Sequence, residues 1–357
     1  MLLENPRIPL RDVFLFGLLP GVLKIWVYRL RGYRIGKRVS IGFGSVICAD
    51  QVDVGDDTKI GLFTIIRGKQ VRIGARVQIG STTFLDTPYM EIGDGTKLNE
   101  QVFVGRLQFP DSKLVVGRNC QITQMSFINP SRNITIGDDT GIGGHSLIFG
   151  HTSWLSQFEG YPVDFQSIEI GRSVSLSWRV FVLPGTKIGD GAVVGANSVV
   201  SRTVPPRCLS LGFPARVVAQ SPDFPKILDD EEKRKILRNI MDDFAKYYSQ
   251  SGLEVSVQGN DYEVRQKKRK WLRTKERKWG LRVAYGDLNE GDVPSRSNRI
   301  DVFLSLMEIP SNIRTRLTAE NITWLDIARK EQSLVTNELG DEVSLFLKSY
   351  GVRTLRV

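Results

Sequence analysis

An aliphatic–glycine dipeptide recurs along the chain from residue 35 to residue 189, and its regular spacing restricts the fold more than any other feature of the sequence. The successive intervals are 19, 19, 19, 24, 20, 34 and 18 residues. The dipeptides begin at Ile35, Val54, Ile73, Ile92, Val116, Ile136, Ile170 and Ile188. Periods of this length are typical of repeat proteins, in which each unit stacks on the next and buries a continuous core.

Within each unit, aliphatic residues also recur six positions apart, as at Ile136, Ile142 and Ile148. A six-residue step does not produce the 3.6-residue stripe of an amphipathic helix. It describes a coil with three short sides, each of which turns one aliphatic side chain inward. Such coils pair their backbone groups with the coils above and below. The sequence therefore predicts a mainly β, triangular solenoid.

Two intervals are longer than the rest, and we interpret them as insertions. The interval of 24 residues predicts a small loop at 107–113, and the interval of 34 predicts a large loop at 152–167. The larger loop comes immediately after His151. Loops that protrude from a rigid scaffold often carry functional residues.

The repeats resemble those of the hexapeptide-repeat acyltransferases, over residues 35–219. The most specific segments are Pro184-Gly185, the run from Gly195 to Val200 and Pro214-Ala215-Arg216. The resemblance is to sugar O-acetyltransferases of the maltose and galactoside acetyltransferase type. It implies a left-handed parallel β-helix, acetyl-CoA as co-substrate and a homotrimer with active sites between neighbouring prisms.

Four segments follow from this pattern. We expect an N-terminal helical cap at 1–34, the acyltransferase β-helix at 35–220, a linker at 221–228 and an α+β domain at 229–357. Apolar spacing predicts a helix from Asp230 to Gln250 in the last domain. A basic tract with Trp271 and Trp279 follows. Solvated charge explains it better than nucleic-acid binding, and this domain carries no recognisable catalytic motif.

The apolar stretch from Val13 to Leu23 is too short to span a bilayer, which requires about 20 apolar residues. Two interpretations remain open. The segment can form a helix that caps the open end of the β-helix. Alternatively, it can attach to an anionic membrane surface at shallow depth, because Lys24, Trp26 and several arginines follow it.

The net charge of +10 indicates an anionic partner, such as a phosphorylated cofactor, a membrane surface or nucleic acid. The three cysteines, Cys48, Cys120 and Cys208, are far apart and show no metal-ligand spacing. We therefore expect no metal and no disulfide framework. A reducing compartment fits best, so we expect a cytoplasmic protein, peripheral to the inner face of the membrane if the N-terminal segment attaches there.

Acyl transfer requires a base that removes the proton of the acceptor, and imidazole is suited to this at neutral pH. The chain has two histidines, His145 and His151, and both lie in one coil. His151 stands where the family has its catalytic histidine, before the protruding loop. His145 could bind the acceptor, orient His151 or act as the base, or it could be a bend residue. A carboxylate could polarise the base, and the candidates are Asp86, Glu100 and Asp164.

The resemblance also implies roles for residues in the later coils. It assigns the backbone N–H of Trp178, with Ser177 beside it, to the oxyanion of the tetrahedral intermediate. Ala196 and Ser198 would line the pantetheine arm, and Arg202 and Arg216 would contact the phosphates of the cofactor. The Trp178 side chain could instead stack on the acceptor or pack between subunits.

We predict that the protein transfers an acetyl group from acetyl-CoA to a sugar hydroxyl, a reaction that CoA release would report. The expected acceptor is a cell-surface polysaccharide or its precursor. N-acetylation of an amino sugar and a non-catalytic scaffold are the alternatives. A zinc carbonic anhydrase on the same fold would require three histidine ligands, whereas this chain has two.

Overall fold

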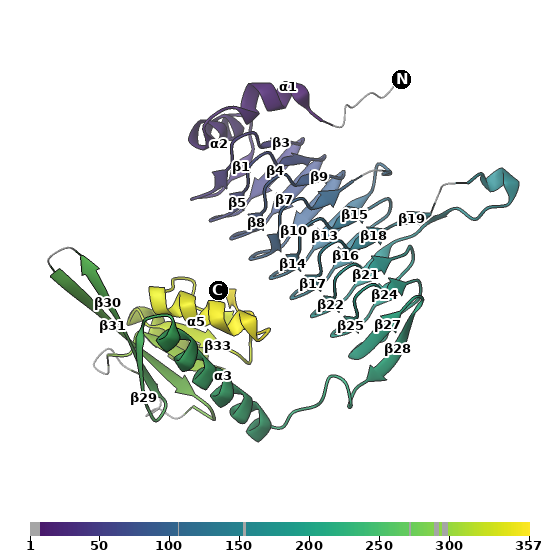
Figure 1. Cartoon of the computed structure of the whole chain (residues 1–357). Coiled ribbons are helices and arrows are strands. Elements are labelled where there is room, and N and C mark those ends of the chain that lie inside the picture. The colour runs from purple at the N-terminus through teal and green to yellow at the C-terminus, as the bar shows by residue number, and fades with distance from the viewer. Residues whose placement is uncertain (1–7, 106, 153–154, 271–272, 289–292, 295–298) are drawn as a thin grey trace. The chain divides into compact units, whose positions relative to one another are not determined.

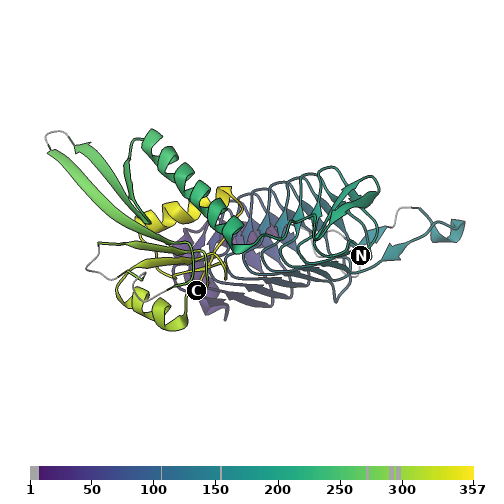
Figure 2. The same ribbon diagram turned by 90° about the horizontal axis from the view of Figure 1, so that it is seen from below.

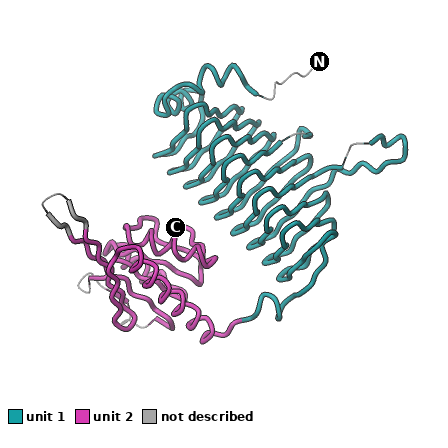
Figure 3. The backbone as a smooth tube through the Cα atoms, viewed as in Figure 1, with its two compact units in different colours: residues 1–227 teal, residues 228–357 magenta. Residues whose placement is uncertain are grey.

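The computed structural model describes residues 8–105, 107–152, 155–270, 273–288, 293–294 and 299–357. The chain forms two compact units, residues 1–227 and residues 228–357 (Figure 3). The predicted fold class is confirmed. The first unit is a left-handed parallel β-helix with a helical N-terminus, and the second is an α+β unit (Figure 1).

Three parallel sheets form the sides of the β-helix, and each coil contributes one short strand to each sheet. Sheet A contains β1 (Arg34–Ile35), β4 (Gln51–Val54), β7 (Gln70–Ile73), β10 (Tyr89–Ile92), β13 (Lys113–Val116), β16 (Ile134–Ile136), β21 (Ile168–Ile170) and β24 (Lys187–Ile188). Sheet B contains β2 (Ser40–Ile41), β5 (Lys59–Ile60), β8 (Gln78–Ile79), β11 (Lys97–Leu98), β14 (Gln121–Ile122), β17 (Gly141–Ile142), β22 (Ser175–Leu176) and β25 (Val193–Val194). Sheet C contains β3 (Val46–Cys48), β6 (Ile65–Arg67), β9 (Phe84–Asp86), β12 (Phe103–Val104), β15 (Phe127–Asn129), β18 (Leu147–Phe149), β23 (Phe181–Val182) and β26 (Val199–Val200). Figures 1 and 2 show the coils stacked in chain order.

The six-residue aliphatic pattern fills the interior of this prism. Ile136, Ile142 and Ile148 each come from a different sheet, and each is at most 1% exposed. Their neighbours in adjacent coils are aliphatic too, since Ile148 pairs with Ile128 on one side and Val182 on the other. Burying one such side chain contributes about 1.5–3 kcal/mol. The stacked aliphatic side chains therefore fix the position of each coil, and of its corner residues, along the axis of the prism.

The two ends of the β-helix are closed differently. At the N-terminal end, a short helical segment from α1 (Leu10–Asp12) through a π-helical turn (Val13–Gly17) leads into α2 (Gly21–Leu30). At the other end, β27 (Cys208–Gly212) joins sheet B in parallel and pairs antiparallel with β28 (Ala215–Gln220). Within the described residues no single helix is long and apolar enough to cross a bilayer. Leu10–Gly17 and Gly21–Leu30 meet that test only as a pair, with a bend of 117° between them.

The second unit is a seven-stranded mixed sheet with helices. In chain order it contains α3 (Asp230–Gln250), β29 (Glu254–Gln258), β30 (Asp261–Lys270), β31 (Arg273–Ala284), β32 (Val302–Ser305), α4 (Ser311–Ala319), β33 (Thr323–Asp326), β34 (Glu331–Gln332), α5 (Glu338–Ser349) and β35 (Leu355–Arg356). The predicted helix is α3, and an Asp229–Glu232 capping box fixes its first turn. The basic tract lies on β30 and β31, except that Trp271 is outside the described residues.

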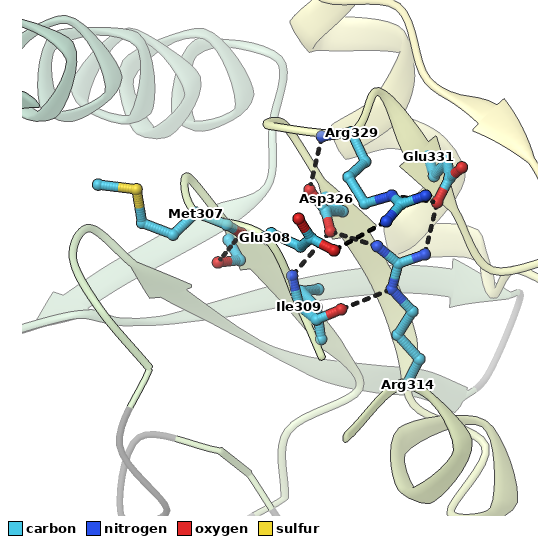
Figure 4. A network of polar contacts seen from close by, with 8 residues as sticks. Met307, Glu308, Ile309, Arg314, Asp326, Arg329 and Glu331 are labelled. Atoms are coloured by element: carbon cyan, nitrogen blue, oxygen red, sulfur yellow. Dashed lines mark hydrogen bonds and ion pairs between the residues drawn. The ribbon is translucent and has the colours of Figure 1, made fainter. Parts of the chain in front are cut away.

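A buried carboxylate ties together the loops of this second unit (Figure 4). Asp326, at the end of β33, is fully buried and accepts hydrogen bonds from the backbone N–H groups of Ile309 (2.8 Å) and Arg329 (2.9 Å). The guanidinium of Arg314 donates to it as well, at 2.7 Å. These hydrogen bonds compensate the buried charge of Asp326 and join the segments that contain Ile309, Arg314 and Arg329. We call this contact the Asp326 anchor.

Candidate active site

His151 lies at the corner between sheets C and A, directly after β18. It begins β19 (His151–Thr152), which pairs antiparallel with β20 (Asp164–Phe165), so that His151 stands opposite Phe165. The described residues between these two strands, 155–163, belong to the loop predicted from the long interval and project from the prism as an arm (Figure 1). His151 is therefore fixed on one side by a rigid coil and on the other by the base of the arm.

A chain of hydrogen bonds orients the imidazole of His151. Its Nδ1 lies 2.9 Å from Oγ of Ser131, and Ser131 Oγ donates to Oδ1 of Asn129 at 3.2 Å. Ser131 and Asn129 are both buried. A serine hydroxyl has a single proton. If that proton goes to Asn129, Ser131 accepts from Nδ1–H of His151, and Nε2 is left with a free lone pair. In this tautomer Nδ1 carries the proton, so Nε2 can accept a proton as a general base does.

Two aromatic rings enclose the same imidazole. The ring of Phe165 stacks on it with a centroid distance of 6.1 Å and an interplanar angle of 12°, and the ring of Phe149 lies 6.0 Å away. His151 is half-buried as a result. Burial disfavours the charged imidazolium and lowers the pKa of His151 below its usual value of 6.5. The imidazole is thus neutral at physiological pH.

The three carboxylates considered as partners for the base do not hydrogen-bond to His151. Asp164 lies in the arm, where its side chain accepts from Gln166. Asp86 ends β9, three coils away, beside Arg67. Glu100 lies at the corner between sheets B and C. Ser131, and not a carboxylate, is the hydrogen-bond partner of the His151 imidazole. The sequence contained the signal for it, because Phe127 pairs with Leu147 at an offset of 20 residues, and the same offset relates Ser131 to His151.

His145 occupies the other end of β18, at the corner between sheets B and C. Its backbone is left-handed, with φ of 57°, and its N–H donates to the carbonyl of Gln124. The exposed imidazole lies against the Trp178 ring, with centroids 5.9 Å apart. The strand β18 lies between His145 and His151, so the two residues stand at opposite ends of one side of the prism. Within one chain, His145 therefore does not orient His151.

Trp178 follows β22 at the same corner as His145. Its carbonyl accepts from Asn197, whereas its N–H has no hydrogen-bond partner in the part of the chain that is described. Arg179, next in the turn, has φ of 59°, as expected for the third position of a type II turn. Trp178 is an exposed residue, so an N–H without a partner at this turn is a candidate donor to a ligand. Ser177 beside it is partly buried, and its own N–H donates to Val194.

The residues assigned to the cofactor lie on different parts of the last coils. Ala196 is exposed at the corner that also carries Trp178, whereas Ser198 is buried there and its hydroxyl accepts from the N–H of Gly212 at 2.9 Å. Ser198 thus has a structural bond in addition to any contact with a ligand. Arg202 follows β26, at the corner of His151, and Arg216 lies on β28. Both guanidinium groups are in exposed residues.

The predicted site residues therefore divide between two corners of one chain. His151 and Arg202 belong to the corner between sheets C and A, whereas His145, Ser177, Trp178 and Ala196 belong to the corner between sheets B and C. A single copy does not bring the base and the unpaired Trp178 N–H together. In the described part of the chain, no three His, Cys, Asp or Glu side chains are grouped as metal ligands would be.

Comparison with known proteins gives partial matches in sequence. No family model matches the chain. WbbJ of Escherichia coli (strain K12), named as a candidate lipopolysaccharide biosynthesis O-acetyl transferase, is 37% identical over 112 residues, which are 28% of this chain and 57% of that protein. Galactoside O-acetyltransferase of the same strain is 30% identical over 114 residues, 31% of this chain and 56% of the enzyme. The chain thus spans little more than half the length of these curated relatives.

Solved structures overlap with the β-helix at low identity. The hexapeptide-repeat acetyltransferase VCA0836 from Vibrio cholerae is 20% identical, with a TM-score of 0.28 over 59% of this chain and 86% of that one. The UDP-N-acetylglucosamine acyltransferase LpxA from Bacteroides fragilis is 16% identical, with a TM-score of 0.44 over 58% and 79%.

The sequence matches, together with the stacked coils, confirm the predicted resemblance to the hexapeptide-repeat acyltransferases. Within that class, the two sequence relatives carry O-acetyltransferase names, one as a candidate and one as a galactoside O-acetyltransferase.

Proposed function

We propose that the protein transfers an acetyl group from acetyl-CoA to a hydroxyl group of a sugar. The observation that carries this proposal is the state of His151. Its Nδ1 is held by Ser131, its ring is enclosed by Phe149 and Phe165, and burial lowers its pKa. A neutral, oriented imidazole with a free Nε2 is prepared to accept a proton from an alcohol.

The reaction requires one proton transfer to the base and one back. His151 Nε2 takes the proton of the sugar hydroxyl as the oxygen attacks the carbonyl carbon of the thioester. The tetrahedral intermediate then collapses, the carbon–sulfur bond breaks, and the thiolate of CoA takes the proton from the imidazolium. The products are the acetyl ester and CoA. No covalent acyl-enzyme is needed, because the acceptor attacks the thioester directly.

The negative charge on the carbonyl oxygen needs a donor in the transition state, and we assign this role to the backbone N–H of Trp178. Trp178 is an exposed residue at its corner, and its N–H is not used by any described group. Removing one donor of this kind typically costs about 10²–10³-fold in kcat.

Because Trp178 and His151 lie at different corners, we propose that neighbouring copies in a homotrimer complete the site. In a ring with threefold symmetry, one surface of each copy meets a different surface of the next copy. The His151 corner of one copy then faces the Trp178 corner of its neighbour. Each of the three interfaces forms one active site from two incomplete halves.

Acetyl-CoA would lie along this interface towards the last coils. Ala196 leaves room for the pantetheine arm, and the exposed guanidinium groups of Arg202 and Arg216 can pair with the phosphates. The names of the relatives support a sugar acceptor, and the lipopolysaccharide relative supports a cell-surface polysaccharide or its precursor. Such acetylation takes place where acetyl-CoA is available, so we propose a cytoplasmic site of action.

The test is release of the CoA thiol from acetyl-CoA in the presence of a panel of sugars that offer hydroxyl or amino acceptors. Wild type is expected to release CoA with a hydroxyl sugar and the His151→Ala variant is not. Faster turnover with amino sugars would replace O-transfer by N-transfer. If CoA neither binds nor is released with any acceptor, the enzyme proposal is wrong and the β-helix is a scaffold.

A further inference from the structure

The helical segment at the N-terminal end of the β-helix is oriented opposite to an ordinary amphipathic cap. In a cap of this kind, apolar side chains face the core and charged side chains face water. Here the fully buried residues of α2 are Lys24 and Tyr28, at 0% and 1% exposure. The large exposed apolar side chains of this segment are Ile8, Leu10, Phe14, Leu15, Leu18, Val22, Leu23, Trp26 and Leu30.

Lys24 shows why the helix must sit this way round. Its Nζ donates to three carbonyl oxygens, those of Gly17 (3.1 Å), Gly42 (2.8 Å) and Ser45 (2.9 Å). Burial lowers the pKa of Lys24 to about 8. A lysine is almost never fully buried without such partners. These bonds use all three donors of the ammonium group and fix one face of α2 against the first coils.

Two further polar contacts hold the same face. The hydroxyl of Tyr28 accepts from the N–H of Ile47 at 2.9 Å, and the guanidinium of Arg29 donates to the carbonyl of Ile35 at 2.9 Å. Since polar bonds seat α2 on the prism, its apolar face is left outward. A transmembrane span that includes α2 would require these bonds to break.

The rim of this apolar face is strongly basic. Between residues 8 and 40 there is one acidic residue, Asp12, and there are six exposed basic residues: Arg11, Arg29, Arg31, Arg34, Lys37 and Arg38. Three of the six form ion pairs with carboxylates. The other three, Arg11, Arg29 and Lys37, have no carboxylate partner among the described residues. The same end of the β-helix therefore combines exposed apolar side chains with several exposed basic side chains.

We propose that this face, which we call the apolar cap, binds the surface of a lipid bilayer that contains anionic headgroups. The helices lie in the plane of one leaflet, with Phe14, Val22 and Trp26 in the boundary between headgroups and acyl chains. Tryptophan is enriched at that depth in membrane proteins. Basic groups at the rim are attracted to anionic lipid, by about 1 kcal/mol for each one near the surface.

A second copy of the chain is the other occupant that could cover the apolar cap, and the charge argues against it. Two caps face to face would bring two rims of the same sign together, which is unfavourable. An anionic bilayer neutralises the rim instead. In this arrangement the coil of His151 stands five strands of sheet C from the first coil, at most about 24 Å from it at the usual strand spacing.

Flotation of the full-length protein with vesicles tests the proposal. One set of vesicles contains phosphatidylcholine alone, and the other contains phosphatidylcholine with phosphatidylglycerol. We compare wild type with Val22→Glu and with the control Val335→Glu, because both valines are 81% exposed and Val335 lies in the second unit. Glutamate in the first turn of α2 is favourable to the helix, so Val22→Glu should remain folded.

We expect wild type and Val335→Glu to float with the anionic vesicles and to bind the neutral ones more weakly. Val22→Glu is expected to reduce the bound fraction by about tenfold or more, since a charge replaces an apolar group that would enter the bilayer. Failure of wild type to bind either vesicle, or equal binding by the two variants, would overturn the proposal. It is also overturned if Val22→Glu dissociates an oligomer in the absence of lipid, because the apolar cap then joins copies of the chain. None of these outcomes depends on acetyl transfer.

Discussion

The two corners that flank sheet C differ in chemistry although one coil supplies a histidine to both. At the corner with sheet A, His151 is half-buried, stacked on Phe165 and hydrogen-bonded through Nδ1 to Ser131. At the corner with sheet B, His145 is exposed, with a left-handed backbone and a single ring contact with Trp178. The same side chain is thus oriented and partly buried at one corner and exposed at the other.

The difference shows that the identity of a residue does not establish its role in a repetitive fold. Every coil offers the same corner positions, with nearly the same backbone. Corner residues differ in their properties where segments outside the repeat, such as the arm, contact them. The arm that carries Phe165 buries His151 from outside, and the Asn129–Ser131 pair orients it from the coil below. The corner of His145 lacks both features and offers an unused N–H instead.

The largest expected effect separates the two histidines directly. His151→Ala should lower kcat for acetyl transfer by about 10²–10⁴-fold, the usual contribution of a general base. His145→Ala should have a much smaller effect, because no hydrogen bond among the described residues orients its exposed ring towards a proton of the acceptor. Steady-state release of CoA measures both variants. A large loss in His145→Ala with little loss in His151→Ala would reverse the assignment of the two corners.

The next effect concerns the N–H of Trp178. Proline is well accepted at the second position of a type II turn, and here it would remove a donor that no described group uses. Trp178→Pro should therefore lower kcat by about 10²-fold with little loss of stability. Trp178→Ala is the matched control, because it removes the ring and keeps the N–H. If the alanine variant is as slow as the proline variant, the side chain acts and the N–H does not.

A smaller effect is expected at Ser131, which acts through His151. Ser131→Ala removes the acceptor of Nδ1–H and should lower kcat by about tenfold, with an unchanged KM for acetyl-CoA. The nitrogen chemical shifts of His151 provide an independent readout. They should change from one protonated Nδ1 to a mixture of tautomers. Unchanged shifts together with a lower melting temperature would show that Ser131 has only a structural role.

The smallest expected effect is a shift in the pH profile. A general base must be neutral, and burial lowers the pKa of His151. Activity should therefore be constant near neutral pH and fall as the pH drops through a value below 6.5. Phe165→Ala uncovers the ring and should move this limb upward, towards 6.5. Phe158→Ala, in the same arm and fully exposed, should leave it unchanged. A limb above 6.5 in wild type would contradict the burial of the base.

The sequence predicted the features of the fold that depend on the regular spacing of the repeats. The coils, their inward aliphatics and both insertions follow from counting residues, and the offset of 20 also relates Ser131 to His151. The separation of the two histidines follows from the same count, since six residues form one side of the triangle. The 20-residue offset therefore pointed to Ser131 as the partner of His151, whereas the predicted partners were all carboxylates.

What period could not predict lies in the aperiodic segments. Nothing in the spacing places Phe165 on the ring of His151, because the arm pairs antiparallel, outside the coil register. The orientation of α2 is a second case. Its apolar residues suggest a core-facing helix, and the polar contacts of Lys24, Tyr28 and Arg29 reverse that orientation. The second unit has no repeat, and contacts such as the Asp326 anchor join loops far apart in sequence.

The central claim is that the two corners of neighbouring copies form one site. His151→Ala and Trp178→Pro damage different halves, so each variant alone should be nearly inactive. When the two are unfolded, mixed in equal amounts and refolded, random assembly restores both intact halves at about a quarter of the interfaces of a cyclic trimer. We predict recovery of about a quarter of the wild-type kcat. Mixed trimers that stay as inactive as either variant would contradict the claim.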